Sequence, residues 1–443
     1  MKIADLHRLF LDAKGVSKDS RDTLDRIYFS LRGERFDGNE FALAALEQGA
    51  CAAVVAADSR IAQDPSLARL RDQEKIIVVD DPLKTLQELA RFHRSRFRIP
   101  VIALTGTNGK TTTKELIRTA LSAKYRVTAT QGNLNNHIGV PLTLLEINQD
   151  TEIAVIEMGA SAPGEIRQLT SIALPTFGLI TNVGTAHILG FNSFEGVKQT
   201  KGELYDYLQR TADLAFVHMD NPHLAEMARM RPDLRIQPYG MDLAGAHIVP
   251  SSWEHPFLCL AFSDGDTLDT QLVGHYNADN VLAALAIAAY FDVPKAAARA
   301  AIAAYQPANN RSQLVKTANN LLIVDAYNAN PSSMKAALDS FQQMDYPNKG
   351  VILGDMRELG SVSETEHRAI LQRLVSMSLK AVWLVGEEFG KLQKEWPATT
   401  PSARFFQDVH ALETHLNQCP SQEMTWLIKG SNSIGLQKIV EWF

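Results

Sequence analysis

The sequence predicts an α/β protein of three domains: a small α/β domain, a central domain with a mostly parallel sheet, and a Rossmann-like C-terminal domain. Three observations lead to this prediction. The chain has 443 residues, which is too long for one hydrophobic core. Short apolar runs rich in Val and Ile alternate with helical stretches, as in parallel sheets covered by helices. One such run ends in a glycine loop that opens a helix.

The apolar runs divide the chain near residues 82 and 310, so that we expect domains at 1–82, 83–310 and 311–443. The strand-like runs of the first domain lie at residues 27–31, 52–56 and 76–79, and residues 33–38 are predicted to form a turn-rich loop. Those of the last domain alternate with helical stretches and lie at residues 321–324, 350–353, 381–385 and 426–428. The last domain lacks a Gly-x-Gly-x-x-Gly motif, so a dinucleotide is not indicated there.

Composition narrows the class of protein. The formal net charge is −6, which argues against a nucleic-acid partner. The three cysteines, Cys51, Cys259 and Cys419, are widely separated and fit a reducing cytoplasm better than a disulfide framework. The N-terminus has no long apolar run, so we expect neither a signal peptide nor membrane insertion. We expect a monomer in the cytoplasm.

A glycine loop of the phosphate-binding kind follows the apolar run at residues 101–104 and opens a helix. Gly106 and Gly109 let the backbone turn tightly, and the helix N-terminus adds a positive dipole end. Lys110 can reach the outer phosphates of a nucleotide, and the Thr111 hydroxyl can ligate Mg²⁺. The loop is shorter than the general P-loop, and the alternative is an ordinary strand-to-helix turn. The motif alone indicates ATP or GTP in a central P-loop ATPase-like domain.

Two polar side chains follow predicted strands, and a third lies in a predicted helix. Glu157 comes directly after the run at 153–156, where a carboxylate beside a phosphate loop is expected to bind Mg²⁺. His187 follows the run at 177–180, and we favour contact with metal or substrate over a structural role. Lys201, taken alone, is expected to be a solvated surface charge.

Four stretches, at residues 105–115, 132–141, 325–334 and 354–360, resemble the Mur ligases, the ATP-dependent amide-forming enzymes of peptidoglycan precursor synthesis. The last three resemble the MurF type, which adds D-alanyl-D-alanine to UDP-N-acetylmuramoyl-tripeptide. The resemblance spans nearly the whole chain. It implies that ATP converts the terminal carboxylate of the peptide to an acyl phosphate, which the dipeptide amine then attacks.

The resemblance also implies the role of each site residue. Those expected to act in catalysis are Lys110, Glu157, His187, Lys201 and Arg311. Those expected to bind ATP are Gly106, Thr107, Asn108, Gly109, Lys110, Thr111, Thr112, Asn277, Asn280, Arg311 and Asp325. Mg²⁺ would be bound by Thr111, Glu157, His187 and a carbamate on Lys201. The substrates would contact Ser20, Arg21 and Arg35 in the UDP-sugar-binding segments, and Asn133, Asn136, Tyr327, Asn328 and Asn330 elsewhere.

The chain departs from the family pattern at four positions, Ser161, Ala162, Leu189 and Asn310, none of which removes a chemical group from the implied mechanism. Three alternatives stay open from the sequence. One is a sister ligase that adds the third amino acid, or a folylpolyglutamate synthetase. The second is an ATPase that couples hydrolysis to conformational switching, and the third is a non-catalytic nucleotide-binding module. The third residue of the tripeptide, meso-diaminopimelate or lysine, is also left open.

Overall fold

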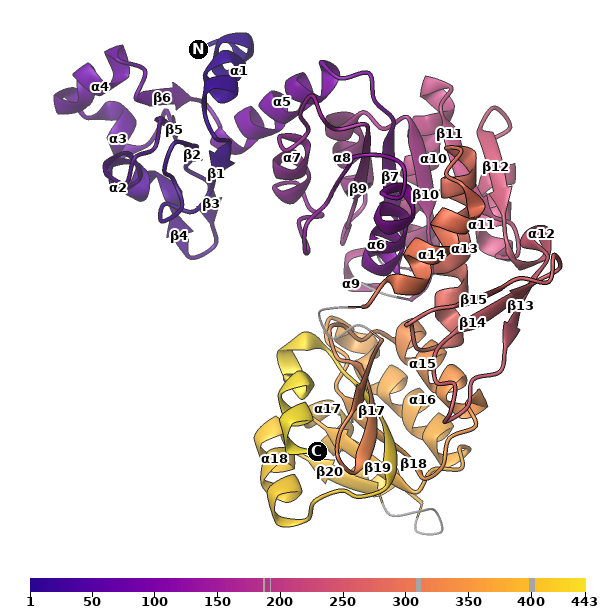
Figure 1. Cartoon of the computed structure of the whole chain (residues 1–443). Coiled ribbons are helices and arrows are strands. Elements are labelled where there is room, and N and C mark those ends of the chain that lie inside the picture. Colours follow the sequence, from indigo (N-terminus) through magenta and orange to yellow (C-terminus); the bar gives the residue numbers. More distant parts are fainter. Residues whose placement is uncertain (186–187, 192, 308–311, 398–402) are drawn as a thin grey trace.

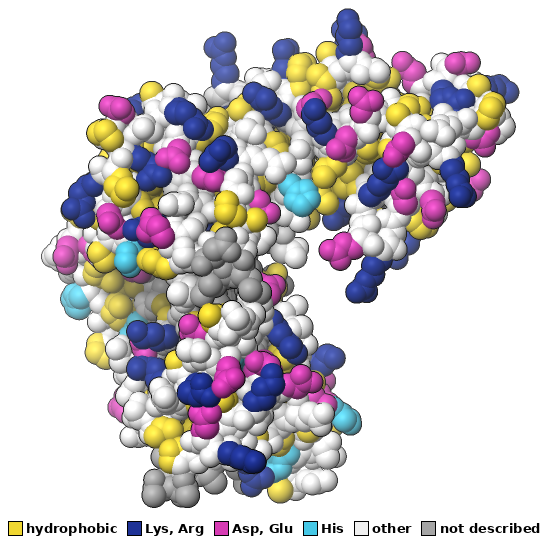
Figure 2. Space-filling view, turned by 180° about the vertical axis from the view of Figure 1, so that it is seen from behind, with side chains coloured by type: hydrophobic (Ala, Val, Ile, Leu, Met, Phe, Trp, Pro, Cys, Tyr) yellow, Lys and Arg dark blue, Asp and Glu magenta, His cyan; other side chains and the backbone are white. Residues whose placement is uncertain are grey.

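The computed structural model describes residues 1–185, 188–191, 193–307, 312–397 and 403–443, so that His187, Asn310 and Arg311 lie outside the described residues. Three domains follow one another along an arc, with the first and last domains at its two ends (Figure 1). Figure 2 shows that the space between these ends is open and that basic and acidic side chains are interspersed over that face. Within the described ranges, each helix is too short or too polar to span a bilayer.

The N-terminal domain is built on a parallel sheet of order β1-β2-β5-β6. Its strands are β1 (Val16–Ser17), β2 (Ile27–Phe29), β5 (Ala52–Ala56) and β6 (Ile76–Val79). The last three confirm the predicted runs, and β1 was not predicted. The helices of this domain are α1 (Ile3–Asp12), α2 (Ala42–Glu47), α3 (Arg60–Gln63) and α4 (Ala68–Asp72). Alternate residues of β5 face two cores: Val55 packs in the core that includes α2, and Val54 in the core that includes α1.

The segment at residues 33–38, predicted as a turn-rich loop, contains a short antiparallel pair instead. The pair joins β3 (Arg32–Gly33) to β4 (Phe36–Asp37), and Arg32 Nε donates to Asp37 Oδ2 across it at 3.1 Å. The prediction of a loop was wrong because two-residue strands are too short to show the alternation of apolar and polar side chains that marks a strand.

Helix α5 (Pro82–Ser95) joins the first domain to the central one. The residue before it, Asp81, caps the helix, because its side chain accepts hydrogen bonds from two backbone N–H groups of the first turn. The helix packs against α1 on one side and against α7 (Gly139–Leu144) and α8 (Glu165–Ala173) on the other. Because α5 contacts both domains, the boundary near residue 82 stays a prediction.

The central domain holds a six-stranded parallel sheet of order β12-β11-β10-β7-β9-β8. Its strands are β7 (Val101–Thr105), β8 (Val127–Ala129), β9 (Ile153–Glu157), β10 (Phe177–Ile180), β11 (Leu214–His218) and β12 (Arg235–Tyr239). Along β7, Val101 and Ala103 face α7, α8 and α10, while Ile102 and Leu104 face α6, α13 and α14. These last four helices are α6 (Lys110–Leu121), α10 (Phe194–Thr211), α13 (Ala278–Tyr290) and α14 (Lys295–Ala304). The short helices of the domain are α9 (Ile188–Phe191), α11 (Pro222–Arg229) and α12 (Met241–Ala244).

A small antiparallel sheet extends from the central domain toward the C-terminal domain (Figure 1). Its strands are β13 (Ala246–Val249), β14 (Cys259–Phe262) and β15 (Thr267–Asp269), and β14 and β15 form a hairpin. Near this sheet, the backbone N–H of Asp345 in the C-terminal domain donates to Ser251 O at 3.2 Å.

The C-terminal domain confirms the prediction of a mostly parallel sheet. The strand order is β16-β17-β21-β18-β19-β20, and β16 alone is antiparallel to its neighbour. The strands are β16 (Gln313–Lys316), β17 (Asn320–Asp325), β18 (Lys349–Gly354), β19 (Ala381–Val385), β20 (Ala403–Phe406) and β21 (Met424–Lys429). The helices are α15 (Pro331–Gln343), α16 (Ser363–Val375), α17 (Glu387–Lys391) and α18 (Val409–Gln418).

A buried pair of histidines links α1, α5 and the central domain. His7 Nε2 lies 3.0 Å from His93 Nδ1, and His93 Nε2 lies 2.7 Å from Ile147 O. Because a carbonyl only accepts, His93 Nε2 donates to it, and the neutral Nδ1 then accepts from His7. Burial lowers the pKa of both rings, and the neighbouring His93 lowers the pKa of His7 further.

Acid is therefore expected to weaken this junction. The folded-state pKa values lie below the ordinary value of 6.5, so the unfolded chain binds more protons and the free energy of unfolding falls as pH drops through that value. The calorimetric unfolding midpoint should fall between pH 7.5 and 5.5, and His7→Leu should show a smaller fall. The control His410→Leu, at an exposed histidine, should behave as the wild type. An equal fall in His7→Leu and the wild type would contradict this assignment.

Candidate active site

A pocket of about 690 Å³ lies between the central and C-terminal domains. The phosphate loop after β7 and the end of β9 line one side, and the segment after β17 lines the other. Both sheets thus turn their carboxyl ends toward one space, which is where parallel sheets bind ligands. The volume is in the range of small-molecule sites.

The phosphate loop lies close to the end of β10. Gly106 has φ +145° and Gly109 has φ +76°, both in the region that favours glycine. A Cβ at Gly106 would lie 2.0 Å from Thr181 Oγ1. Beyond the glycine, Thr181 Oγ1 and Asn182 Nδ2 donate to Asn108 O at 2.7 and 3.0 Å. The loop is therefore fixed by the neighbouring strand end before α6 begins.

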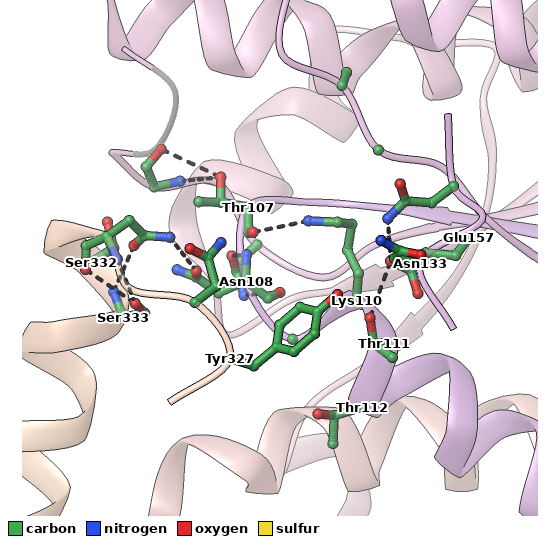
Figure 3. A pocket seen from close by; sticks show the side chains of 18 of the residues that line it. Thr107, Asn108, Lys110, Thr111, Thr112, Asn133, Glu157, Tyr327, Ser332 and Ser333 are labelled. Carbon is green, nitrogen blue, oxygen red and sulfur yellow. Dashed lines mark hydrogen bonds between the residues drawn. The ribbon is translucent and has the colours of Figure 1, made fainter. Parts of the chain in front are cut away.

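Two side chains of the loop point in different directions (Figure 3). Lys110 Nζ donates back to the loop, to Gly106 O at 2.8 Å and to Thr107 O at 3.0 Å. Thr111 Oγ1 donates to Glu157 Oε1 at 3.2 Å. The ammonium thus lies over the loop where phosphates would bind, and the hydroxyl lies beside a carboxylate.

Glu157 is 1% exposed, although it is an acid at the end of a strand. Its Oε1 accepts from Asn135 Nδ2 at 2.8 Å, in addition to Thr111. Its backbone N–H donates to Thr130 Oγ1 at 2.9 Å. Among the described residues, Oε2 is buried and has no hydrogen-bond partner. A buried carboxylate oxygen without a donor is a strong candidate for a cation ligand.

Lys201 lies inside the protein, so the expectation of a solvated surface charge was wrong. The residue is 2% exposed, because α8, the segment before it and α9 cover that face of α10. Its Nζ donates to Ala160 O at 3.2 Å, and Ala160 lines the pocket. Burial and then the positive charge of Lys110 lower the pKa of Lys201 to about 7, against the raising effect of Glu165 and Glu203.

Three of the residues expected to bind the nucleotide, Asn277, Asn280 and Asp325, are hydrogen-bonded to other side chains at the pocket. Thr113 Oγ1 donates to Asn280 Oδ1 at 2.9 Å, and Asn280 Nδ2 donates to Asn277 Oδ1 at 2.9 Å. Across the pocket, Asp325 Oδ2 accepts from Lys429 Nζ at 2.5 Å. Asn277, Asn280, Asp325 and Lys429 line the same pocket, as do Thr107, Asn108, Gly109, Lys110, Thr111 and Thr112.

The C-terminal domain contacts the phosphate loop directly. Asn330 Nδ2 donates to Asn108 Oδ1 at 2.8 Å, and Ser332 Oγ accepts from the backbone N–H of Thr185 at 2.8 Å. Figure 3 shows the ring of Tyr327 directed toward the phosphate loop. The remaining pocket residues expected to contact substrate are Asn133, Asn136 and Asn328.

The structure does not bring every predicted residue to the pocket. Ser20 and Arg21 follow β1, and Arg35 lies between β3 and β4, so all three lie in the N-terminal domain away from the pocket lining. Arg21 is exposed and is paired with Asp19. His187 and Arg311 fall outside the described residues.

Sequence reasoning missed three residues that hold the site together: Asn135, Ser332 and Lys429. Two of them lie in motifs that the sequence analysis quoted, but their partners, Glu157 and Thr185, are distant in the chain. Lys429 directly follows the predicted strand at 426–428, so its place at a strand end was a usable signal.

Comparison with known proteins gives matches along most of the chain. Residues 7–94, 104–288 and 310–432 match the family profiles described as "Mur ligase family, catalytic domain", "Mur ligase middle domain" and "Mur ligase, glutamate ligase domain". A Bacillus subtilis protein named UDP-N-acetylmuramoyl-tripeptide--D-alanyl-D-alanine ligase is 36% identical over 366 residues, covering 80% of this chain and 76% of the relative. An Escherichia coli protein of the same name is 32% identical, covering 97% and 93%.

Solved structures show the same arrangement. A crystal structure of MurF from Acinetobacter baumannii superposes with a TM-score of 0.82 at 27% identity, covering 99% of this chain and 98% of that one. The similarity therefore includes all three domains.

The close packing at Gly106 gives a test of the phosphate loop. Gly106→Ala forces a Cβ into Thr181 Oγ1 at an unfavourable φ, so the affinity for ADP should fall by about tenfold or more, roughly 1.4 kcal/mol. Calorimetric titration with ADP measures this. The matched control is Gly265→Ala, which has φ +86° but no atom within 4 Å of the new Cβ and lies in the β14–β15 turn. Undiminished affinity in Gly106→Ala would show that nucleotide binds elsewhere.

Proposed function

This chain belongs to the Mur ligase family, and we propose that it uses ATP to join D-alanyl-D-alanine to UDP-N-acetylmuramoyl-tripeptide in cytoplasmic peptidoglycan precursor synthesis. The observation that carries the proposal is the meeting of the phosphate loop and the 325–334 segment across one pocket. Asn330 and Asn108 join these two motifs at 2.8 Å. A switching ATPase or a bare nucleotide-binding module has no need for this junction.

The reaction has two steps. An oxygen of the peptide carboxylate attacks the γ-phosphorus of ATP, the bond to the β-phosphate oxygen breaks, and an acyl phosphate and ADP form. The amine of D-alanyl-D-alanine then attacks the acyl carbon, loses a proton, and expels inorganic phosphate as the amide forms. Closure of the C-terminal domain over the pocket would exclude water, which would otherwise hydrolyse the acyl phosphate.

The phosphate loop supplies the positive charge that the first step requires. In the proposed reaction, Lys110 leaves the carbonyls of Gly106 and Thr107 and turns to the γ-phosphate. Its charge, the N-terminus of α6 and Arg311 offset the charge that develops on the transferring group. We propose Asn277, Asn280 and Asp325 as contacts of the nucleoside, supported by their place in the pocket lining.

The residues around Glu157 fit a magnesium ion. The unpartnered Oε2 of Glu157 and the Thr111 hydroxyl beside Oε1 are hard oxygen donors of the kind that Mg²⁺ prefers. We propose these two side chains as ligands, with His187 as a third. When bound, the ion neutralises phosphate charge during transfer.

We propose that Lys201 carries a carbamate. A neutral amine attacks CO₂, forms an N–C bond and releases one proton, so carbamylation requires the unprotonated lysine. Burial and the Lys110 charge lower the pKa of Lys201 to about 7, which supplies that form near neutral pH. The modification would replace a buried cation by two hard oxygen donors for Mg²⁺.

The substrates are assigned by domain. We propose that residues 1–82 bind the UDP-sugar through Ser20, Arg21 and Arg35. Ser20 and Arg21 follow β1 of the parallel sheet, and Arg35 lies in the turn between β3 and β4 of the same domain, which supports the proposal. Residues 83–310 would bind ATP, and residues 311–443 would close on it. Where the two domains meet, the contacts proposed for peptide and dipeptide are Asn133, Asn136, Tyr327, Asn328 and Asn330.

Phosphate release tests the ligase proposal directly. Release from ATP should require both UDP-N-acetylmuramoyl-tripeptide and D-alanyl-D-alanine, because the acyl phosphate forms only on the peptide and turns over only with the amine. The assay measures phosphate with each substrate omitted in turn and identifies the pentapeptide product by mass. Equal release with ATP alone would favour a switching ATPase.

The carbamate gives a second test. Lys201→Ala should be nearly inactive and should recover part of its activity with short carboxylic acids such as acetate. Wild-type activity at limiting bicarbonate should fall as pH drops below about 7, because the amine becomes protonated. Lys198→Ala is the matched control, since this lysine lies one turn away on α10 and is paired with Glu226. Full activity of Lys201→Ala would refute the proposal.

A further inference from the structure

A lysine outside the predicted site is buried at the carboxyl edge of the C-terminal sheet. Lys429 is the last residue of β21 and is 2% exposed. Its Nζ donates to Asp325 Oδ2 at 2.5 Å and to Asn328 O at 3.2 Å. A buried ammonium is tolerated only where it is paired and hydrogen-bonded, and both partners here belong to the segment that lines the pocket.

Strand register explains why the two charges meet. β17 and β21 are parallel neighbours, and Asp325 lies opposite Lys429. Side chains alternate along a strand, so the pair projects to the same face as Ile323 and Leu427, which pack in the core that includes α15. β21 is an interior strand, because it is hydrogen-bonded to β17 on one edge and to β18 on the other. The Lys429 ammonium is therefore attached to a strand that is fixed on both sides. Asp325, in contrast, ends its strand and begins a loop.

Lys429 holds this loop at two points. One is the Asp325 carboxylate and the other is the carbonyl of Asn328. Two residues later, Asn330 caps α15 and donates to Asn108 Oδ1 of the phosphate loop. The direction of the carboxylate and the approach of Asn330 to the phosphate loop therefore both depend on one amine.

The resemblance to the Mur ligases implies that Asp325 holds the ribose of ATP. We propose that Lys429 is a positioning residue, which orients Asp325 toward that ribose and holds the 325–330 loop against the phosphate loop. The inference rests on the proposed function, since it places ATP in this pocket. It adds a residue for which the sequence analysis gave no role. Two other roles make different predictions: direct contact of the ammonium with a phosphate, and a purely structural role in the sheet.

The proposal is tested by measuring how strongly binding depends on the ribose hydroxyls. Calorimetric titration would compare ADP with 2′-deoxy-ADP and 3′-deoxy-ADP in the wild type and in Lys429→Met. The wild type should bind ADP more tightly than at least one deoxy analogue. Lys429→Met should lose about tenfold in affinity for ADP. This variant should bind ADP and the deoxy analogue with equal affinity, because a displaced carboxylate no longer recognises the hydroxyl. Lys429→Arg, which keeps the charge, should regain part of the preference.

A matched control is Lys349→Met. Lys349 lies at the opposite end of the sheet, at the start of β18, and its Nζ donates to three backbone carbonyls at the end of α15. This variant should keep the affinity for ADP and the ribose preference. Lys429→Met with weaker binding but an intact preference would indicate a phosphate contact, and unchanged binding would indicate a structural role. Either result overturns the proposal.

A second pair of variants decides the question if Lys429→Met does not fold. Asp325→Asn with Lys429→Met removes both charges, so no uncompensated charge is left buried. If Lys429 acts on the ribose through Asp325, neither Asp325→Asn nor the double variant should prefer ADP over the deoxy analogue, and a preference that survives in the double variant would overturn the proposal. A wild type that does not bind ADP would instead refute the proposed function. A ribose preference retained in Lys429→Met would refute only this inference.

Discussion

The close approach of the phosphate loop to the end of β10 is the constraint on which the site depends. No side chain fits at Gly106, because a Cβ there would lie 2.0 Å from Thr181 Oγ1. The approach brings Thr181 and Asn182 to the carbonyl of Asn108, and the side chain of Asn108 then accepts from Asn330. One backbone contact between adjacent strands thus extends to the placement of the C-terminal domain.

The order of apolar and polar residues along the chain predicted the interior strands of the sheets but missed several edge strands. Buried runs of Val, Ile and Ala gave the interior strands, such as β5 and β7, because both faces of a parallel strand are covered. The edge strands β16 and β20 were not predicted, since partly exposed strands lack a continuous apolar run. The pair β3–β4 was missed because each strand has only two residues.

Burial of charge is the part of the site that the sequence could not predict. Lys201 lies on a helix among polar and apolar residues, and nothing local distinguishes it from Lys198 on the same helix. Tertiary packing decides the difference, since Lys201 is covered and donates to Ala160, whereas Lys198 pairs with Glu226 at the surface. The pKa of a charged group that is excluded from water depends on its burial and on the few charges beside it. Burial and the Lys110 charge therefore lower the pKa of Lys201 to about 7.

The pocket lies between two sheets, and each sheet contributes one carboxylate that is hydrogen-bonded to a side chain of its own domain. Glu157 is held by Asn135 in the central domain, and Asp325 by Lys429 in the C-terminal domain. Each half is therefore ordered within its own sheet. At the pocket, the Asn330–Asn108 bond and the contacts near Ser332 bring the halves together. Because each carboxylate is held by a partner from its own domain, movement of one domain would change the distance between ordered halves without disordering either.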